Sequence, residues 1–419
     1  MHLLIISHTA HYTQDGKYVG WGPTVKEISW LARAFDQITH LAFLHAGPAP
    51  RNSLPYEAEN IKIITVPPAG GLTLRAKIRV VTQGPRYLKQ IINILPKADI
   101  IHVRCPGSLG MYGMIASSFV TKKRKWIKYA GNWKAGLNQM ALSHIFQREW
   151  LRFGFSQAIV TVNGRWENQP VHVIPFLNPS ASINEINCAG EICADKKLIP
   201  PYRIVFVGNA SRKKGLHSAL KIVKELNLNH PGRFIFDVVG DGPEKSSFEE
   251  FVDKNKLGDI VIFHGWVSHS QVFEILRPAH FILLPTTSSE GWPKVLSEAM
   301  MFGVVPLASE ISSIPQIFAS AGTGIGIPPN DIDAFIKTIQ YLITDPEEWT
   351  RMSKEGINIA PQFSYERYLL AIDEMFCDFY GKSPLKQDFI AEVRDAFIKI
   401  PHSNLDKYWY HGFDRLSSH

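Results

Sequence analysis

Short apolar runs alternate with longer amphipathic segments through most of this 419-residue chain. The runs LLII, IVFV, FIFDVV and FILL have the length of buried β-strands, and turn-rich segments follow them. After the first run, the apolar residues Ile28, Leu31, Ala32 and Phe35 recur at helical spacing. This alternation of strand and helix predicts an α/β fold with parallel sheets.

The segment Ser288–Ser309 combines this strand–helix pattern with candidate ligand-binding residues. An apolar run ends in a loop at Ser288, a helix with an apolar face follows, Gly303 ends that helix, and GVVPLAS begins another strand. The loop therefore lies at the carboxyl end of a predicted strand, where ligands bind in α/β sheets.

Two carboxylates, Glu290 and Glu298, stand eight positions apart across this loop and helix. The start of the helix offers N–H groups to an anion, and carboxylates accept hydrogen bonds from hydroxyls. A phosphate beside a polyol is the chemistry of a nucleotide-sugar, so the pattern favours such a ligand. Taken alone, two such carboxylates are more often a partner of the helix dipole and a solvated surface residue.

The same segment resembles the Glu-x(7)-Glu signature of the retaining glycosyltransferases of family 4. The shared residues are Glu290, Gly291, Glu298, Ala299, Met300, Gly303 and Pro306. The resemblance implies that Glu290 binds the donor sugar, that Glu298 binds the ribose, and that the turn at Gly291 and Trp292 supplies backbone contacts. Trp292 and Pro293 replace a phenylalanine and a glycine of the family, and Pro293 has no N–H to donate.

A basic loop after the strand at Tyr202 resembles the diphosphate loop of the family. Lys214 takes the place of the family lysine that holds the donor diphosphate, and Asn209 replaces a family arginine. Arg212 or Lys213 could supply the missing charge, which is needed because no metal is expected to neutralise the leaving diphosphate. In isolation, a basic loop is more often only a solvated loop.

Two further loops extend the resemblance. Gly265 and Val267 match a loop whose backbone contacts the nucleotide base in the family. Near the amino terminus, Gly20 and Gly22 precede an amphipathic helix, where the family has a glycine loop that meets the diphosphate and the acceptor. The alternative for these two glycines is an ordinary connection that needs glycine for its turns.

His102 and Arg104 end a predicted strand, IIHV, in the amino-terminal half. The family often has two histidines here, one of which faces the reaction centre. His102 takes the first position and Arg104 replaces the second. A histidine at a strand end is otherwise usually a structural residue.

Composition gives the general class. The chain is 45% hydrophobic and 20% charged, which is ordinary for a globular protein. Its four cysteines are too few for a disulfide framework and lack the pairing of a zinc site, so we expect free cytosolic thiols. No apolar run reaches transmembrane length, and the first residues lack the basic region of a signal peptide.

The charge is uneven along the chain. Residues 1–180 contain 21 lysines and arginines against 8 acidic residues. Arg75, Lys77 and Arg79 are interleaved with apolar residues, and the basic run Lys122–Lys125 is followed by Trp126 and Ile127, which suits an anionic membrane surface. A solvated basic face is the alternative, and no motif supports nucleic-acid binding.

We therefore predict two doubly wound, Rossmann-like α/β domains facing each other across a cleft, the GT-B arrangement implied by the resemblance. The expected boundaries are an acceptor domain at 1–179, a linker at 180–201, a nucleotide-sugar domain at 202–380, and a tail at 381–419. Aromatic residues of this tail, among them Trp409 and Phe413, suggest packing on the first domain.

The predicted activity is transfer of a sugar, with retention, from a nucleotide-sugar to a hydroxyl of a glycan or lipid-linked acceptor in surface polysaccharide synthesis. We expect a cytoplasmic, peripherally membrane-bound enzyme that needs no metal or cofactor. The predicted catalytic residues are Glu290, His102 and Lys214, and the donor-binding residues are Asn209, Arg212, Lys214, Gly291, Trp292, Glu298, Gly265, Val267, Gly20 and Gly22. The alternatives are a nucleotide-sugar-binding protein with weak turnover and a GT-B epimerase.

Overall fold

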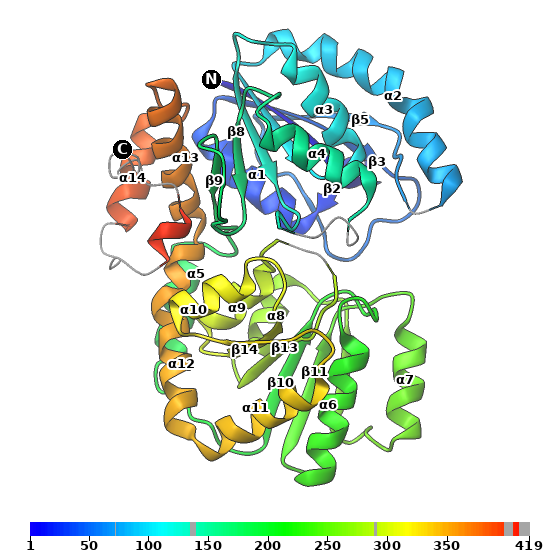
Figure 1. Cartoon of the computed structure of the whole chain (residues 1–419), viewed down its shortest axis with the longest axis vertical. Coiled ribbons are helices and arrows are strands. Elements are labelled where there is room, and N and C mark those ends of the chain that lie inside the picture. Colours follow the sequence, from blue (N-terminus) through cyan, green and yellow to red (C-terminus); the bar gives the residue numbers. More distant parts are fainter. Residues whose placement is uncertain (72, 135–139, 289–290, 398–404, 410–419) are drawn as a thin grey trace. The chain divides into compact units, whose positions relative to one another are not determined.

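The computed structural model describes the chain except for residues 72, 135–139, 289–290, 398–404 and 410–419. The chain divides into two compact units (Figure 1). Within the described residues, unit 1 consists of Met1–Leu177 together with 365–397 and 406–409, and unit 2 consists of Asn178–Ser364 and Leu405.

Unit 1 is built on a sheet that has nine strands within the described residues. Its elements are β1 His2–Gln14, β2 Lys17–Trp21, α1 Gly22–Ala34, β3 Gln37–Leu44, β4 Ser53–Pro55, β5 Ile61–Val66, α2 Leu74–Ile94, β6 Ile100–Cys105, α3 Ser108–Ser118, β7 Arg124–Tyr129, α4 Leu142–Arg152, β8 Ile159–Val162, β9 Val173–Pro175, α13 Tyr365–Tyr380 and α14 Gln387–Phe397. Strands β5, β3, β1, β6, β7, β8 and β9 pair in parallel in that order, while β2 and β4 add an antiparallel edge.

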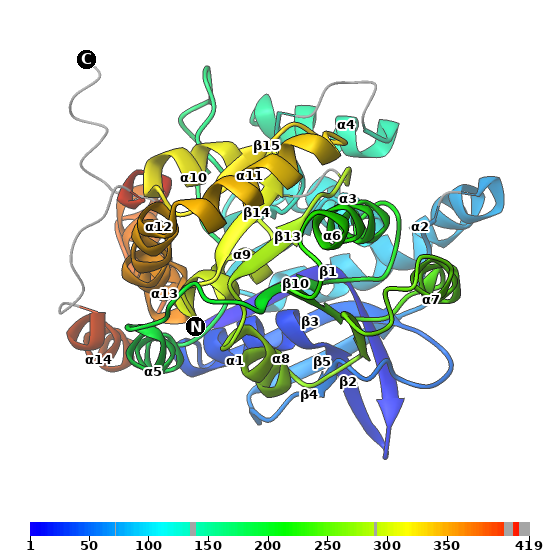
Figure 2. The same ribbon diagram turned by 90° about the horizontal axis from the view of Figure 1, so that it is seen from below.

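Unit 2 is built on a parallel sheet in the order β12-β11-β10-β13-β14-β15. Its elements are α5 Ile183–Cys193, β10 Tyr202–Val207, α6 Leu216–Asn229, β11 Phe234–Val239, α7 Lys245–Lys254, β12 Val261–Gly265, α8 His269–Leu276, β13 Phe281–Leu284, α9 Lys294–Met301, β14 Val305–Ser309, α10 Ile314–Ala321, β15 Ile325–Ile327, α11 Ile332–Thr344 and α12 Pro346–Ile359. Helices α6 and α8 lie on opposite faces of this sheet (Figure 2).

The strand order of unit 2 reverses at one place. The chain runs outward from β10 through β11 to β12, and then returns to β13 on the other side of β10. The carboxyl ends of β10 and β13 therefore diverge into loops on opposite faces, which is where doubly wound sheets bind ligands. The predicted α/β class with doubly wound, Rossmann-like units is confirmed.

The core of unit 2 follows the hydrophobic pattern of its elements. Alternate residues of β10, such as Ile204 and Phe206, are fully buried, and α6 buries a stripe that includes Leu216, Leu220 and Val223. Each of these side chains stabilises the fold by roughly 1.5–3 kcal/mol relative to full exposure. Packing on both faces explains why the strands are apolar throughout.

Two predicted boundaries are wrong. The expected linker 180–201 contains helix α5, which begins with a capping box between Ser182 and Glu185 and buries Ile186 and Ala189. Its polar composition hid a three-turn amphipathic helix, since half of its surface remains solvated. Helix α13, expected in the second domain, belongs to unit 1, where Tyr365 stacks on Trp30.

The end of the described chain also packs within unit 1. The Trp409 ring lies edge-on to Phe176 at 4.9 Å between centroids. The backbone N–H of Lys386 donates to the carbonyl of Ala34 over 2.9 Å. Phe413, the other tail aromatic singled out from the sequence, lies outside the described residues.

None of the helices in the described ranges combines the length and the apolar character needed to cross a bilayer.

Candidate functional site

Two loops of unit 2 are joined at the point where the strand order reverses. The carbonyl of Lys213, in the loop after β10, accepts hydrogen bonds from the Thr287 N–H and the Thr286 hydroxyl, both at 3.0 Å, in the loop after β13. Gly215 sits between the loops with φ of 89°, and a Cβ there would collide with the carbonyl of Pro285. Only glycine allows this close approach, so the two loops form one rigid surface.

The loops after β11 and β12 continue this surface. The Gly208 N–H donates to Val239 over 2.9 Å, the Ala210 N–H donates to Asp241 over 3.0 Å, and the Gly240 N–H donates to Gly265 over 2.8 Å. The carboxyl ends of four adjacent strands are therefore connected by backbone hydrogen bonds. Gly265, predicted from the sequence as a donor contact, lies within this connected region.

Lys214 is the most enclosed of the three cations in the loop after β10. Its side chain is half-buried, whereas Asn209, Arg212 and Lys213 are exposed. The Arg212 guanidinium lies 3.6 Å from the carboxylate of Glu244, which partly neutralises it. A half-buried ammonium is screened less by water than an exposed guanidinium, so Lys214 is the stronger local charge for an anion.

Glu298 lies on α9 with its side chain 13% exposed. Its Oε1 is 3.3 Å from Nε2 of His269, the first residue of α8. His269 follows the half-buried Val267, so the contact connects the loop after β12 to α9. The sequence analysis missed His269. Its only sequence signal is that it begins a helix directly behind the Ser268 cap.

Glu290, the predicted sugar-binding carboxylate, lies outside the described residues. Its neighbour Gly291 is described and is buried.

Trp292 turns its side chain into the core of unit 2. The indole is 3% exposed, stacks on Phe363 at 5.4 Å and donates from Nε1 to the Ser297 hydroxyl over 2.7 Å. This side chain is therefore a packing residue, and only the backbone of Trp292 remains for a donor contact.

Gly20 and Gly22 do not lie in an open loop as predicted. Gly20 belongs to strand β2, and a Cβ there would come within 2.8 Å of Nε2 of His11. Gly22 begins α1 and donates its N–H to the carbonyl of Asn52 over 3.1 Å. The close approach of these chains explains both glycines without a ligand.

His102 is fully buried in β6 rather than facing an open site. It stacks on Trp126 with ring centroids 3.9 Å apart, and its Nδ1 lies 3.1 Å from the Trp126 carbonyl. Burial and, secondly, the charge of Arg104 lower the pKa of His102 to about 3. The imidazole is therefore neutral and enclosed, and the predicted position facing the reaction centre is not the one observed.

A buried charge cluster next to His102 was also missed. The Glu27 carboxylate, fully buried on α1, lies 2.8 Å from the Arg104 guanidinium and 2.9 Å from the Lys128 ammonium, and the Tyr368 hydroxyl donates to it over 2.9 Å. A buried carboxylate needs such partners, because unpaired burial of a charge is costly. The sequence did not indicate a buried Glu27, because this residue lies in an otherwise ordinary amphipathic helix.

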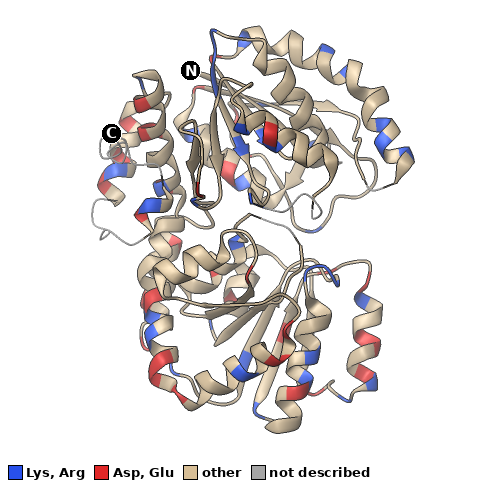
Figure 3. Cartoon of the chain, in the orientation of Figure 1, with Lys and Arg blue, Asp and Glu red and all other residues tan. Residues whose placement is uncertain are grey.

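The basic run Lys122–Lys125 does not form the expected continuous surface. Arg124 begins strand β7, and Lys125 is buried with its ammonium directed to the Ser117 carbonyl at 3.4 Å. Lys123 donates to the Pro96 carbonyl over 3.1 Å. In contrast, Arg75, Lys77 and Arg79 are exposed on α2, a helix that contains no acidic residue (Figure 3).

Comparisons with known proteins match most of unit 2 to a family model. Residues 194–359 match the family model described as glycosyl transferases group 1. One similar relative is a putative colanic acid biosynthesis glycosyltransferase, WcaL of Salmonella typhimurium, which is 27% identical over 139 residues. That match covers 32% of this chain and 34% of the relative, so the chain matches about a third of the length of this relative.

Solved structures resemble nearly the whole chain. A sucrose-phosphate synthase from Thermosynechococcus elongatus is 17% identical, with a TM-score of 0.65 over 91% of this chain and 99% of that one. HepE of Anabaena in complex with UDP is 16% identical, with a TM-score of 0.63 over 90% of this chain and 100% of that one. At these identities the likeness shows the GT-B fold alone.

Proposed function

We propose that this chain, whose residues 194–359 match the family model of group 1 glycosyl transferases, moves a sugar from a nucleotide-sugar to a hydroxyl of a glycan or lipid-linked acceptor. The observation that carries the proposal is the joined set of loops at the carboxyl ends of β10, β11, β12 and β13. Within this set, the half-buried Lys214 and the partly buried Glu298 supply a cation and a carboxylate.

Lys214 would bind the diphosphate of the donor. Negative charge grows on the leaving phosphate oxygen as the bond to the sugar breaks, and a fixed cation stabilises that charge more in the transition state than in the ground state. Backbone N–H groups of the same glycine-containing loop would add hydrogen bonds. No metal is part of this proposal.

Glu298 would accept hydrogen bonds from the ribose hydroxyls. The contact at 3.3 Å from His269 orients the carboxylate, because it fixes Oε1 and leaves Oε2 for the ligand. We assign Glu290 to the sugar on the resemblance alone.

The proposed reaction retains the configuration of the sugar. The bond between the anomeric carbon and the phosphate oxygen breaks, and the acceptor oxygen forms its bond on the same face. The acceptor proton passes to the oxygen of the leaving diphosphate, so no side chain is required as a base. The contribution of the protein is positioning and electrostatic stabilisation.

A peripheral position on the cytoplasmic face of a membrane, and a place in surface polysaccharide synthesis, are part of the proposal. The support is helix α2, where Leu74, Ile78 and Val81 are exposed to 73%, 55% and 70% beside three basic residues. Apolar side chains and cations together suit the interface of an anionic bilayer. The similarity to WcaL, named as a putative colanic acid biosynthesis glycosyltransferase, supports a place in surface polysaccharide synthesis.

A panel of nucleotide-sugars tests the proposal. UDP-sugars come first, because the similar HepE was solved with UDP, and GDP-, ADP- and CMP-sugars follow. The expected result is a thermal shift and slow release of the free nucleotide with one base class. Failure of all four classes to bind or to release nucleotide would contradict the proposed function.

A nucleotide-sugar-binding protein with weak turnover is the second candidate. It is favoured by Asn209, which replaces the family arginine, and by the contact of Arg212 with Glu244, since both weaken the positive charge at the diphosphate. Binding of a donor without transfer to any acceptor and without hydrolysis would support this candidate.

A further inference from the structure

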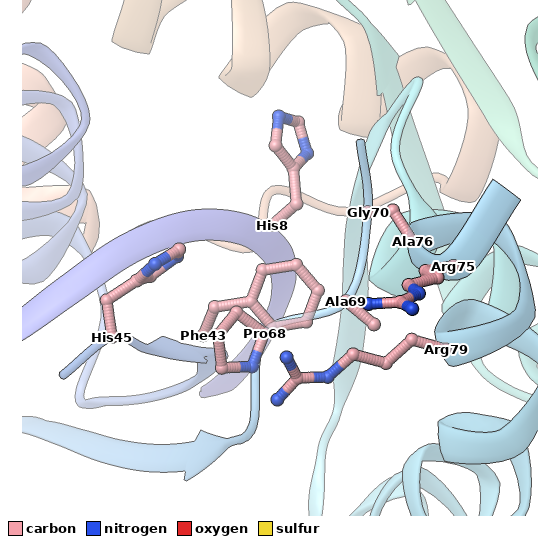
Figure 4. A pocket seen from close by; sticks show the side chains of 9 residues that line it. All are labelled: His8, Phe43, His45, Pro68, Ala69, Gly70, Arg75, Ala76 and Arg79. Carbon is pink, nitrogen blue, oxygen red and sulfur yellow. The ribbon is translucent and has the colours of Figure 1, made fainter. Parts of the chain in front are cut away.

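Unit 1 contains a pocket that the donor site does not explain. Its volume is about 530 Å³, and it is lined by His8, Phe43, His45, Pro68, Ala69, Gly70, Arg75, Ala76 and Arg79 (Figure 4). Its residues come from β1, from the carboxyl end of β3, from the loop after β5 and from α2. A pocket of this size suits a small molecule or one part of a larger one.

The walls of the pocket are firmly positioned. The Tyr87 hydroxyl of α2 donates to the Pro67 carbonyl over 2.6 Å, and the Tyr87 ring packs on Phe43 at 5.9 Å. On the other side, the His45 N–H donates to the His11 carbonyl over 2.8 Å. The loop after β5 and the middle of α2 are therefore held against the sheet, which preorganises the pocket.

Two guanidinium groups enter this pocket from one helix. Arg75 and Arg79 lie four residues apart, so they share a face of α2, and Figure 4 shows both directed toward the side of Pro68 and Ala69. Neither arginine has a carboxylate partner within the described part of the chain, and the described lining contains no acidic residue. Two cations without a counter-charge at the first turns of a helix, where the helix dipole is also positive, create a local positive potential that favours an anion.

The other side chains that line the pocket suit the uncharged, hydroxylated part of a ligand. Desolvation by the surrounding chain, followed by the positive charge of Arg104 and the effect of His144, lowers the pKa of His8 to about 4. The His8 residue still keeps exposed surface. Burial lowers the pKa of His45 as well. Both imidazoles are therefore neutral near pH 7 and exchange hydrogen bonds with hydroxyls. Phe43, between His45 and the arginines in Figure 4, offers an apolar surface for the C–H face of a sugar ring.

We propose that this pocket binds an acceptor sugar that carries a phosphate or a carboxylate, with Arg75 and Arg79 holding the anion and His8 and His45 contacting hydroxyls. Bidentate bonding by arginine matches both anions. This inference rests on the proposed function, because it names the class of acceptor that the enzyme would glycosylate.

Ligand-observed NMR on the full chain tests the pocket directly. The probes are glucose 6-phosphate, glucuronic acid, neutral glucose and inorganic phosphate. We expect the two anionic sugars to bind at least about tenfold more tightly than glucose or phosphate, because only they use both sets of side chains. Equal binding of glucose and the anionic sugars, or phosphate binding as tight as sugar phosphate, would overturn the proposal.

Variants on the same helix supply the matched control. The double change Arg75→Gln with Arg79→Gln should weaken the binding of the anionic sugars by about tenfold or more. Lys77→Gln with Lys89→Gln removes the same charge from exposed positions of α2 outside the pocket and should leave binding within about twofold. An equal loss of affinity in both variants would indicate non-specific electrostatic attraction to the helix, and would overturn the proposal. Circular dichroism checks that each variant is folded.

Two further readouts separate the sources of failure. Vesicles containing phosphatidylglycerol test a lipid headgroup, and binding of vesicles without binding of either anionic sugar would overturn the proposal in favour of a lipid. Nucleotide release from donors by the wild type is measured in parallel. If nucleotide release is present and the chain does not bind the anionic sugars, the inference fails while the proposed function stands.

Discussion

Replacing Lys214 by alanine is the sharpest perturbation of the proposed donor site. The side chain is half-buried in a loop fixed by the hydrogen bonds to the Lys213 carbonyl, so its ammonium is held in place and partly shielded from water. Loss of one such charge-stabilising group in a preorganised site costs about 3–4 kcal/mol in the transition state. Turnover of the nucleotide-sugar should therefore fall by several hundredfold.

The assay measures release of the nucleotide at saturating donor, with Lys213→Ala and Arg212→Ala as matched controls. The Lys213 side chain is exposed, and its carbonyl, which joins the two loops, survives the substitution. Arg212 is exposed and lies beside Glu244. Both controls should stay within about threefold of wild type. If Lys214→Ala stays within threefold while one control loses activity, the assignment of the phosphate cation to Lys214 is refuted.

Four other changes test separate parts of the account. Glu298→Gln should weaken donor binding by about 1.5–3 kcal/mol, since it removes a charged acceptor for hydroxyls, and unchanged calorimetric affinity would remove Glu298 from the site. Trp292→Ala should lower the free energy of unfolding by about 3–5 kcal/mol in urea titrations because it empties a packed core position; a loss below about 1 kcal/mol would contradict that packing. Glu27→Gln should destabilise the chain by about 3–5 kcal/mol, since it leaves two buried cations without their carboxylate, and a wild-type urea midpoint would argue against the cluster. The pKa of His102 is about 3 in the folded state against 6.5 in the unfolded state, so the unfolded state takes up the proton first and stability falls as pH drops from 6.5 toward 3; His102→Phe should reduce the loss between pH 7 and pH 5 by about 2 kcal/mol, and an identical loss in both proteins would refute that contribution.

The sequence predicted the elements of the sheets well because strands buried on both faces are continuous apolar runs. It also located the loop of Lys214 and the helix of Glu298, since both lie directly after such runs. It misassigned α5, because a short helix with one buried face has the composition of a linker. It could not assign α13 to unit 1, because that depends on contacts between residues far apart in the chain, such as Trp30 and Tyr365.

The site in unit 1 was the least predictable part. His102 and Arg104 are neighbours in one strand, and only the structure shows that His102 stacks on Trp126 while Arg104 pairs with Glu27. The pocket of Arg75 and Arg79 gathers residues from two strands, a loop and a helix, and no local pattern brings them together. The basic run at Lys122–Lys125 was a misleading signal, since a lysine within a strand can be buried along its stem.

Hydrogen–deuterium exchange of the full chain, with and without the donor nucleotide that the panel identifies, tests the central claim most directly. A nucleotide held by Lys214 and Glu298 should slow exchange in the loops 208–215 and 265–269 and at the start of α9. The same measurement should show little change in β7 and β8, which lie in unit 1. Saturating nucleotide that leaves the loops after β10 and β12 unprotected, or protects only unit 1, would contradict the account.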